Sequence, residues 1–285
     1  MTEAILSGEE IGLDLGATLT KAVVVEAGSS LADFQTFLFP SGDRASIAAF
    51  LASRRSPHLA ATGAGARRLA KQFTGDRPVF IEDEFQAWGL GEEALLIGAD
   101  FVPSRPHLLV SLGTGTSILR VETGEAVVRV GGTGLGGGTL QGFGRLLLDE
   151  TDYDTLTSLA AQGDRRRVDL LVRDLYGAGE IPLSGDLTAA NLGRVLSRDP
   201  RDLAHAIVGL IGENVGLLAG ALARGENGAA PLDIVYAGAT LRANVALHDV
   251  LAFTSSLVGA TARFLPYGEF VGAVGALVAA RRSRA

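Results

Sequence analysis

The sequence predicts an α/β protein of two related lobes, in which mixed β-sheets are flanked by helices. The first indication is the length of 285 residues, which suits about two domains, with 47% apolar residues to fill their cores. The second is an internal repeat, since residues 11–28 and 107–132 share an order of strand, small-residue turn and strand. We place the boundary in the proline-containing stretch 101–107, which gives lobes 1–104 and 105–285.

The elements expected in the first lobe follow from its apolar spacing. Alternating and β-branched residues on both sides of a small-residue turn predict two tightly joined strands within 11–28, and residues 32–40 suit a third strand. Helical spacing predicts a helix over 45–55. A short strand over 77–82 then leads into a helix over 83–99, which a glycine interrupts.

The second lobe begins with the repeated pattern, which predicts three strands within 107–132, and continues mostly as helix. The expected helices span 140–150, 153–163, 165–177, 187–197 and 202–225. A late strand over 232–239 runs into one more helix. The apolar run Phe270–Ala280 is too short to span a bilayer, so we expect a buried helix there, with the arginines that follow at its C-terminal end.

Composition excludes several classes of function. A net charge of −7 argues against nucleic acid and acidic membranes as partners, so we expect neither. The absence of cysteine excludes disulfides, thiolate zinc sites and cysteine nucleophiles. The four histidines are scattered, which disfavours metalloprotease and Ser-His-Asp chemistry. The acidic N-terminus is unlike a signal peptide, and together these features predict a soluble cytoplasmic protein.

Two glycine-containing turns are the candidate phosphate sites, because such turns direct several backbone N–H groups at one point. The residues concerned are Asp14, Gly16, Ala17, Thr18 and Lys21 in the first hairpin, and Gly113, Thr114, Gly115 and Thr116 in the second. Asp14 is placed to hold Mg²⁺ through a water shell. Lys21 is one of two lysines in the chain, and a compact charge beside the turn suits phosphate. A plain β-turn capped by Asp14 is the alternative for the first hairpin.

Half of residues 129–142 are glycine, and the segment contains a G-x-G-x-x-G pattern. A dinucleotide-binding turn needs a second parallel strand after its helix, and the pattern here continues as helix, so we reject that reading. The glycines, Gly136, Gly137 and Gly138 among them, better suit a loop and helix N-terminus facing phosphate, with Arg129 directed at the same anion. Gly238 begins another strand-to-helix turn, on which a base or ribose could lie.

Glu82, Asp83 and Glu84 follow the strand expected at 77–82. A carboxylate at this point could accept the proton of a substrate hydroxyl. Taken alone, the run is better explained as a solvated acidic surface.

Together these motifs resemble the superfamily of acetate kinase, sugar kinases, Hsp70 and actin, and within it the type II pantothenate kinases. The resemblance covers nearly the whole chain and is carried by GLDLGATLTK, LLVSLGTGTSI and RVGGTGLGGGTLQGFGRLL, with support from TDYDTLTSLAAQGD, VDLLVRDLYG, SGDLTAANLGRV, IVYAGATLRAN and GEFVGAVGAL. It implies two duplicated actin-like (ribonuclease H-like) lobes with an ATP cleft between them. It also implies ATP and Mg²⁺ as cofactors and phosphorylation of pantothenate to 4'-phosphopantothenate, the first step of coenzyme A biosynthesis.

The resemblance assigns roles to particular residues. Glu82 stands seven residues before Gly89, as the family's catalytic base does before its Gly-Leu-Gly segment, so it takes that role ahead of Asp83 and Glu84. Arg129 matches the arginine that contacts substrate and reacting phosphate. Asp14 matches the metal position, and the segment with Gly238 matches the adenosine site. The chain departs from the family pattern at Ala17, Trp88 and Phe264, which bears on substrate range.

The family resemblance also implies a homodimer. Val168, Leu171, Val172 and Leu175 would form one apolar stripe on the helix expected at 165–177, although packing inside the lobe explains the same stripe. A kinase for another small hydroxyl compound, such as pantetheine or an amino sugar, and a non-catalytic nucleotide or acyl-CoA sensor are the alternative functions.

Overall fold

The computed structural model describes residues 8–54, 56, 58–73, 79–176, 183–225 and 229–284. The chain forms two compact units. Unit 1 contains Met1–Val102, Val121–Val128 and Leu265–Ala285, and unit 2 contains Pro103–Arg120 and Arg129–Phe264. These units differ from the expected lobes 1–104 and 105–285, because Val121–Val128 and Leu265–Ala285, which we had assigned to the second lobe, belong to unit 1. The C-terminal segment belongs there because its helix packs on the first sheet.

Unit 1 is built on a five-stranded sheet with the strand order β3-β2-β1-β4-β5. The strands are β1 (Glu9–Leu15), β2 (Leu19–Glu26), β3 (Gln35–Pro40), β4 (His58–Thr62) and β5 (Val79–Ile81). β1 is antiparallel to β2 and parallel to β4, and β4 is parallel to β5, so the sheet is mixed as predicted. Its helices are η1 (Leu31–Asp33), α1 (Arg44–Ser53), α2 (Ala66–Phe73), α3 (Glu84–Leu96), η6 (Gly268–Phe270) and α8 (Val271–Arg282).

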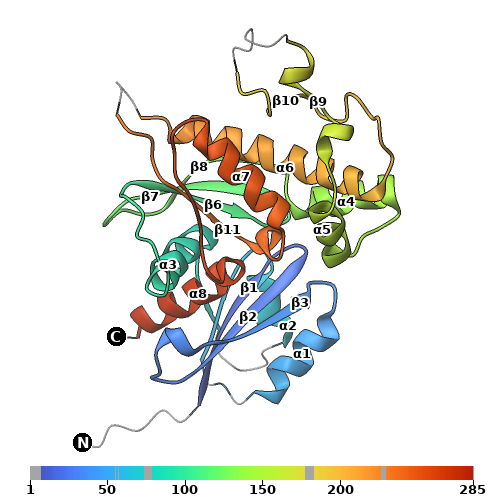
Figure 1. Ribbon diagram of the computed structural model, residues 1–285. Helices are drawn as coiled ribbons and strands as arrows, with labels where there is room; N and C mark the ends of the chain where they lie inside the picture. The colour runs from blue at the N-terminus through green and yellow to red at the C-terminus, as the bar shows by residue number, and fades with distance from the viewer. Residues whose placement is uncertain are drawn as a thin grey trace, which may run out of the picture. The chain divides into compact units, whose positions relative to one another are not determined.

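The alternation of β1 decides which helix covers which face of this sheet. Ile11, Leu13 and Leu15 pack with α1 in one hydrophobic cluster. Gly12 points to the opposite face, where a Cβ would stand 2.1 Å from the carbonyl oxygen of Ala273 in α8. Only glycine permits this close approach of strand and helix. Asp14 shares the parity of Gly12 and therefore faces α8, with α3 lying alongside that helix (Figure 1).

Unit 2 repeats the same sheet, with the order β12-β11-β6-β7-β8. The strands are β6 (His107–Leu112), β7 (Thr116–Val121), β8 (Val128–Thr133), β11 (Ile234–Ala237) and β12 (Ala262–Phe264). Counted from its own first strand, this order is the same as that of the first sheet, which confirms the duplication expected from the repeated hairpins. Its main helices are α4 (Gly137–Leu148), α5 (Tyr153–Ala161), α6 (Pro200–Ala223) and α7 (Val245–Ser256), with the short η5 (Ala239–Leu241).

Helices α6 and α7 lie side by side, and their apolar residues share one core with β6 and β11 (Figure 1). Among the described residues, α6 is the helix long and apolar enough to cross a membrane by length and composition. Since 67% of its most apolar window is buried inside the fold, it has the character of a core helix.

Two predicted helices are wrong. Residues 165–176 form η2 (Arg165–Arg167), β9 (Leu170–Leu171) and η3 (Val172–Asp174), and residue 177 lies outside the described residues. Residues 187–197 form β10 (Thr188–Ala190) and loop. The physical reason is mutual pairing, because the carbonyls of Arg167 and Val168 accept hydrogen bonds from the amides of residues 194–197 instead of from a helix of their own.

Besides the short 3-10 helices, two strands and one α-helix went unpredicted, namely β4, β12 and α2. The other predicted strands and helices are present with shifted ends, and α3 continues through Gly89 and Gly91, where we had expected an interruption. Residues 1–7, 55, 77 and 78, which also took part in the sequence predictions, lie outside the described residues.

Candidate active site

Four polar residues stand in one row at an edge of the first sheet, where the parallel strands β1, β4 and β5 reach their carboxyl ends. Lys21 on β2 pairs in register with Asp14 on β1, and Asp14 pairs with Thr62 on β4. The row ends at Glu82, whose amide donates to Ala61 and whose carbonyl accepts from Thr62 Oγ1 at 3.1 Å. The carboxyl ends of parallel strands are the usual ligand-binding edge of α/β sheets.

Asp14 and Lys21 form a buried ion pair at the other end of this row. The exposed fractions are 4% for Asp14 and 9% for Lys21, and the ammonium nitrogen donates to Asp14 Oδ2 at 3.1 Å. Glycines flank both carboxylate oxygens, since a Cβ on Gly63 would stand 2.8 Å from Oδ1 and one on Gly272 would stand 3.0 Å from Oδ2. The backbone thus keeps space around Asp14 that any side chain would fill.

The first hairpin turn closes beside this pair. The amide of Gly16 donates to the carbonyl of Leu19 at 3.2 Å, and the Gly16 carbonyl accepts from Ser41 Oγ at 2.8 Å. A Cβ on Gly16 would stand 3.2 Å from Lys21 Nζ, so glycine leaves room for the lysine. Ala17 is exposed and Thr18 is partly exposed at the tip.

The three consecutive acids that the sequence presents have different environments. Glu82 is partly buried and its Oε1 accepts from the amide of Asp83 at 2.8 Å. Asp83 is exposed and caps α3, accepting from the amides of Phe85 and Gln86. Burial, and next the negative charge of Asp14, raise the pKa of the Glu84 carboxyl, while Lys21 opposes the rise. A uniformly solvated acidic run, our expectation for Asp83 and Glu84, therefore holds for Asp83 and is wrong for Glu84.

In the second unit, three segments far apart in the sequence meet around the second hairpin turn. The carbonyl of Gly113 accepts from the amide of Gly137 and from Thr240 Oγ1, both at 2.8 Å. The carbonyl of Thr114 accepts from the amide of Gly138 at 2.9 Å. The hairpin turn, the start of α4 and the turn after β11 are thereby joined into one backbone cluster.

Tight backbone packing explains why this cluster is rich in glycine. A Cβ on Gly136 would stand 2.8 Å from the carbonyl oxygens of Gly113 and Thr114, and one on Gly138 would stand 2.9 Å from Thr114 Cγ2. Gly238 has φ +110°, and a Cβ there would meet the backbone of Leu112 at 2.2 Å. The sequence argument had assigned these glycines to the approach of a ligand, whereas their contacts here are with the protein's own backbone.

The same contacts decide which amides remain for an anion. Gly137 and Gly138 donate to the hairpin, and Gly113 donates to the carbonyl of Gly115. In the part of the chain that the structure describes, the amides of Gly115, Gly134 and Gly136 donate no hydrogen bond. Thr116 is buried, with its hydroxyl donating to the carbonyl of Leu135 at 2.7 Å.

Arg129 lies on β8, and its side chain is exposed. Its Nε donates to Ser117 Oγ at 3.4 Å, and its guanidinium lies over Gly132, where a Cβ would stand 2.2 Å from Nη2. The guanidinium thus lies over a glycine, where it stays accessible to an anionic ligand.

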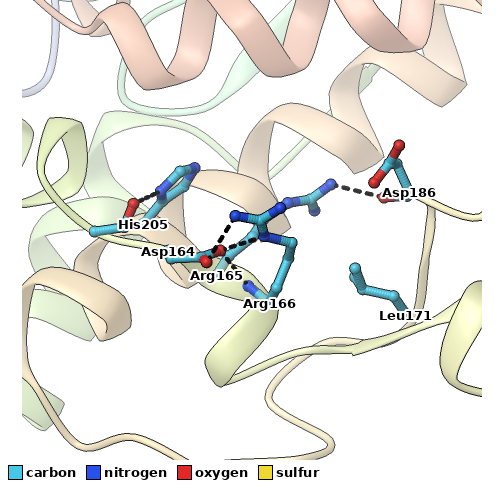
Figure 2. A pocket seen from close by; sticks show the side chains of 7 residues that line it. Asp164, Arg165, Arg166, Leu171, Asp186 and His205 are labelled. Atoms are coloured by element: carbon cyan, nitrogen blue, oxygen red, sulfur yellow. Dashed lines mark hydrogen bonds and ion pairs between the residues drawn. The ribbon is translucent and has the colours of Figure 1, made fainter.

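A separate pocket in unit 2 lies beside η2 and α6 (Figure 2). It is lined by Gly163, Asp164, Arg165, Arg166, Leu171, Asp186 and His205. Its charged groups are engaged with protein partners, since Arg166 pairs with Asp164 at 2.8 Å and Arg165 donates to Glu213 at 2.5 Å. His205 Nδ1 contacts the carbonyl of Gly163 at 2.6 Å. The pocket therefore borders the network in which Arg165, Glu213 and Thr188 hold β10 to α6.

Sequence reasoning missed several residues of the first-unit site. Thr62 ends a strand that carried no clear alternating pattern, and Gly63 and Gly272 lie far from Asp14 in the sequence. Trp88 was noted only as a departure from a family pattern, yet its Nε1 lies 2.9 Å from the point where a Cβ on Gly272 would stand. The parity of Asp14 with Gly12 was the available signal that a helix covers this side of β1.

Comparison with known proteins identifies the family. The Fumble family model matches residues 99–279. The type II pantothenate kinase of Staphylococcus aureus strain USA300 is 35% identical over 276 residues, which covers 94% of this chain and 98% of that protein.

Among solved structures, two with less than 25% identity show the fold. Component A of (R)-2-hydroxyglutaryl-CoA dehydratase from Acidaminococcus fermentans has a TM-score of 0.63 at 16% identity and covers 98% of this chain and 100% of its own. A ROK family glucokinase from Streptomyces griseus, in complex with glucose and AMPPNP, has a TM-score of 0.58 at 19% identity. The match covers 96% of this chain and 100% of the glucokinase chain. From the near full-length match to the staphylococcal kinase and the Fumble model, the chain belongs to the type II pantothenate kinases of the Fumble family.

Proposed function

We propose that this chain transfers the terminal phosphoryl group of ATP to the hydroxyl of pantothenate, giving 4'-phosphopantothenate in the first step of coenzyme A biosynthesis. The observation that carries the proposal is the 35% identity to a type II pantothenate kinase over nearly the whole chain. The row of Lys21, Asp14, Thr62 and Glu82 at the carboxyl edge of the first sheet supports it. Phosphoryl transfer needs mainly positioning and charge stabilisation, which such a row offers.

Glu82 is the proposed general base. Its Oε1 is held by the amide of Asp83, and in the described part of the chain its Oε2 has no partner, so that oxygen is the one to accept the proton of the substrate hydroxyl. Arg129 is proposed to offset the charge that builds on the transferring group. Its exposed guanidinium is suited to paired hydrogen bonds with phosphate oxygens.

The phosphates of ATP are proposed to bind the backbone of the two hairpin turns and the glycine-rich start of α4, and the adenosine to lie by Gly238. In the second unit the unbonded amides of Gly115, Gly134 and Gly136 favour this assignment. The residues assigned from the sequence are Gly16, Ala17, Thr18 and Lys21 in the first turn, and Gly113, Thr114, Gly115, Thr116, Gly136, Gly137 and Gly138 in the second unit.

Mg²⁺ is proposed to accompany ATP at Asp14. Among the described residues, no group of three acidic or histidine side chains could hold a metal alone. One carboxylate flanked by Gly63 and Gly272 nevertheless fits Mg²⁺, which keeps several waters and takes its other ligands from phosphates. The ion supplies neutralisation of phosphate charge, and the protein's part is to keep the Asp14 carboxylate in place.

We also propose a cytoplasmic homodimer. The helix whose stripe suggested dimerisation is absent, and Val168, Leu171 and Val172 are buried inside the unit. Large apolar side chains nevertheless remain exposed on the same region of unit 2, namely Leu175, Tyr176, Leu183, Val195 and Leu196. Light scattering at micromolar concentration is expected to give twice the mass of one chain, and a monomer would overturn this proposal.

A substrate panel with ATP consumption as the readout tests the activity. Pantothenate is expected to give the highest kcat/KM, with pantetheine, glucose and glucosamine as competitors in the same assay. Faster turnover of a sugar or of pantetheine would replace pantothenate as the substrate. ATP binding without turnover of any compound would favour a nucleotide or acyl-CoA sensor.

A further inference from the structure

Ser41, the residue that follows β3, is bonded to the first hairpin turn at two points. The register of β2 and β3 pairs Leu19 with Pro40, so Ser41 comes next to the turn that precedes β2. Its amide donates to the carbonyl of Thr18 at 2.9 Å, and its hydroxyl donates to the carbonyl of Gly16 at 2.8 Å. One serine therefore holds two carbonyls of the turn that we assign to phosphate.

A buried neighbour determines the direction of the Ser41 hydroxyl. Thr20 is 2% exposed, and its Oγ1 lies 3.3 Å from Ser41 Oγ. A hydroxyl carries one hydrogen, and that of Ser41 is directed at the Gly16 carbonyl, so the Thr20 hydroxyl is the donor between the two. This chain of two hydroxyls keeps the hydrogen of Ser41 on the Gly16 carbonyl.

The Gly16 carbonyl and the Ala17 amide belong to one trans peptide, in which C=O and N–H point in opposite directions. A hydroxyl that holds the carbonyl therefore directs the Ala17 N–H away from Ser41. Ala17 is exposed, and among the described residues its amide has no hydrogen-bond acceptor. The ammonium nitrogen of Lys21 lies beside the same peptide, 3.2 Å from the point where a Cβ on Gly16 would stand. The turn thus presents an unbonded N–H close to a positive charge.

A half-turn of this peptide would exchange the two groups and direct the carbonyl oxygen, with its partial negative charge, at an anion. The hydrogen bond from Ser41 opposes this change. The Cβ of Ala17 opposes it as well, because Ala17 keeps φ outside the left-handed region. The half-turn would carry that φ to positive values, which residues other than glycine rarely adopt. The orientation of the peptide therefore has two restraints, of which Ser41 supplies the one from outside the turn.

We propose that Ser41 is a positioning residue, which holds the Gly16–Ala17 peptide so that the Ala17 amide donates to a phosphate oxygen of ATP. This role rests on the proposed use of ATP and extends it to a residue outside the motifs that carry the family resemblance. Ser41 acts through the backbone and does not touch the nucleotide.

Calorimetric titration with AMPPNP in the presence of Mg²⁺ tests this role without turnover. Ser41→Ala removes the hydroxyl and leaves the amide bond to Thr18, so AMPPNP affinity is expected to fall about 10-fold, the order of one hydrogen bond to a charged group. Ser41→Thr, which keeps a hydroxyl, is expected to bind AMPPNP as the wild type does. Adenosine, which has no phosphate, is expected to bind Ser41→Ala and the wild type equally, a result that general damage to the fold would not give.

Ser53→Ala is the matched control, because that hydroxyl also donates to a backbone carbonyl at 2.8 Å, at the C-terminal end of α1, and its loss is expected to leave AMPPNP affinity unchanged. An Ala17→Gly background gives a second comparison. Since glycine removes the restraint on φ, the effect of Ser41→Ala is expected to be larger there. Equal AMPPNP affinity in the wild type and Ser41→Ala would overturn the proposal. An equal loss of adenosine affinity, or an effect that does not grow in the Ala17→Gly background, would overturn it too.

Kinetics separate the role of Ser41 from the proposed function. Ser41→Ala is expected to raise the KM for ATP and to leave the KM for pantothenate unchanged. If the wild type does not phosphorylate pantothenate but its AMPPNP affinity depends on Ser41 as described, the substrate assignment fails and the role of Ser41 stands. If both proteins phosphorylate pantothenate with the same KM for ATP and bind AMPPNP equally, the role of Ser41 fails and the function stands.

Discussion

At the scale of single residues, the environment separates acids that the sequence presents as equivalent. Glu82, Asp83 and Glu84 are consecutive, but Glu82 ends the polar row of the sheet, Asp83 caps a helix, and Glu84 is partly buried where the charge of Asp14 acts on it. Chain direction explains this, because the strand ends at Ile81 and the helix begins at Glu84, so successive side chains diverge.

Glu82→Gln is expected to lower the pantothenate-dependent turnover of ATP by ~10²–10⁴-fold, because glutamine cannot accept the proton of the hydroxyl. Substrate affinity is expected to change much less, since the lost interaction belongs to the transition state. Steady-state kinetics on the purified variants measure both quantities. Asp83→Asn is the control and is expected to stay active. Full activity in Glu82→Gln with none in Asp83→Asn would show that the base has been assigned to the wrong residue.

The buried carboxyl of Asp169 leads us to expect that the stability of the fold depends on pH. It is fully buried, its Oδ1 accepts from the amide of Leu192, and its Oδ2 has no hydrogen bond. Burial raises the pKa of its carboxyl above the ordinary value of 3.8. At a pH between the ordinary pKa of the unfolded chain and the raised pKa of the folded chain, the folded chain keeps a proton that the unfolded chain has released. This group therefore makes the free energy of unfolding fall as pH rises through that range.

Asp169→Asn removes that titration while its amide oxygen can still accept from Leu192. The variant is expected to lose this part of the pH dependence and to be at least as stable as the wild type at neutral pH. Urea unfolding between pH 4 and pH 8 measures the difference. A large loss of stability at neutral pH alone would mean that Arg165, 3.9 Å away, needs a charged Asp169.

At the scale of elements, glycine decides how closely segments approach. The start of α4 lies on the second hairpin turn through two backbone hydrogen bonds, and Gly136 has no room for a side chain at that junction. In the first unit, Gly12 and Gly272 permit the close packing of α8 on β1 beside Asp14. These glycines position the candidate phosphate turns and the candidate metal carboxylate.

Gly136→Ala is expected to destabilise unit 2 by about 1–3 kcal/mol and to weaken ATP binding, because the added methyl forces the helix start away from the hairpin. Gly142→Ala is the matched control, since this exposed glycine of α4 has nothing within 4 Å of a Cβ at its position. Thermal melts and AMPPNP titrations of the two variants are the measurements. Equal stability of both variants would show that the junction can relax.

At the scale of the whole molecule, the chain returns to its first unit at its C-terminal end. Helix α8 is almost entirely buried against β1, β4 and α3, and Arg281 and Arg284 both pair with the buried Glu10 of β1. The two units are therefore not consecutive pieces of sequence, and unit 1 is incomplete without the segment that contains α8.

A chain that ends at Phe264 is expected to lose the cooperative unfolding of unit 1, because the sheet face that carries Asp14 would be exposed. Hydrogen exchange of residues 9–26 in the truncated chain measures this loss. Residues of β6 and β11 are expected to stay protected, since unit 2 has its own core. Wild-type protection of residues 9–26 would contradict the assignment of α8 to the stability of unit 1.

The sequence by itself determined the duplicated fold, the family and most of the candidate site residues. Strand patterns with small-residue turns are local signals, and the family motifs lie in short contiguous stretches such as LLVSLGTGTSI and RVGGTGLGGGTLQG. Asp14, Glu82 and Arg129 could be chosen in this way because their signal lies in their immediate neighbours.

Only the tertiary structure decided the features that depend on contacts between distant segments. Residues 165–176 carry a helical pattern, but their carbonyls pair with residues 194–197 and the inward-turned Arg165 pairs with Glu213. The sequence predicted that Glu84 lies on an acidic surface, whereas in the fold it is partly buried and the charge of Asp14 acts on its carboxyl. Helix α8 belongs to the first unit because burial of its apolar face depends on which sheet it reaches, and no local pattern encodes that choice.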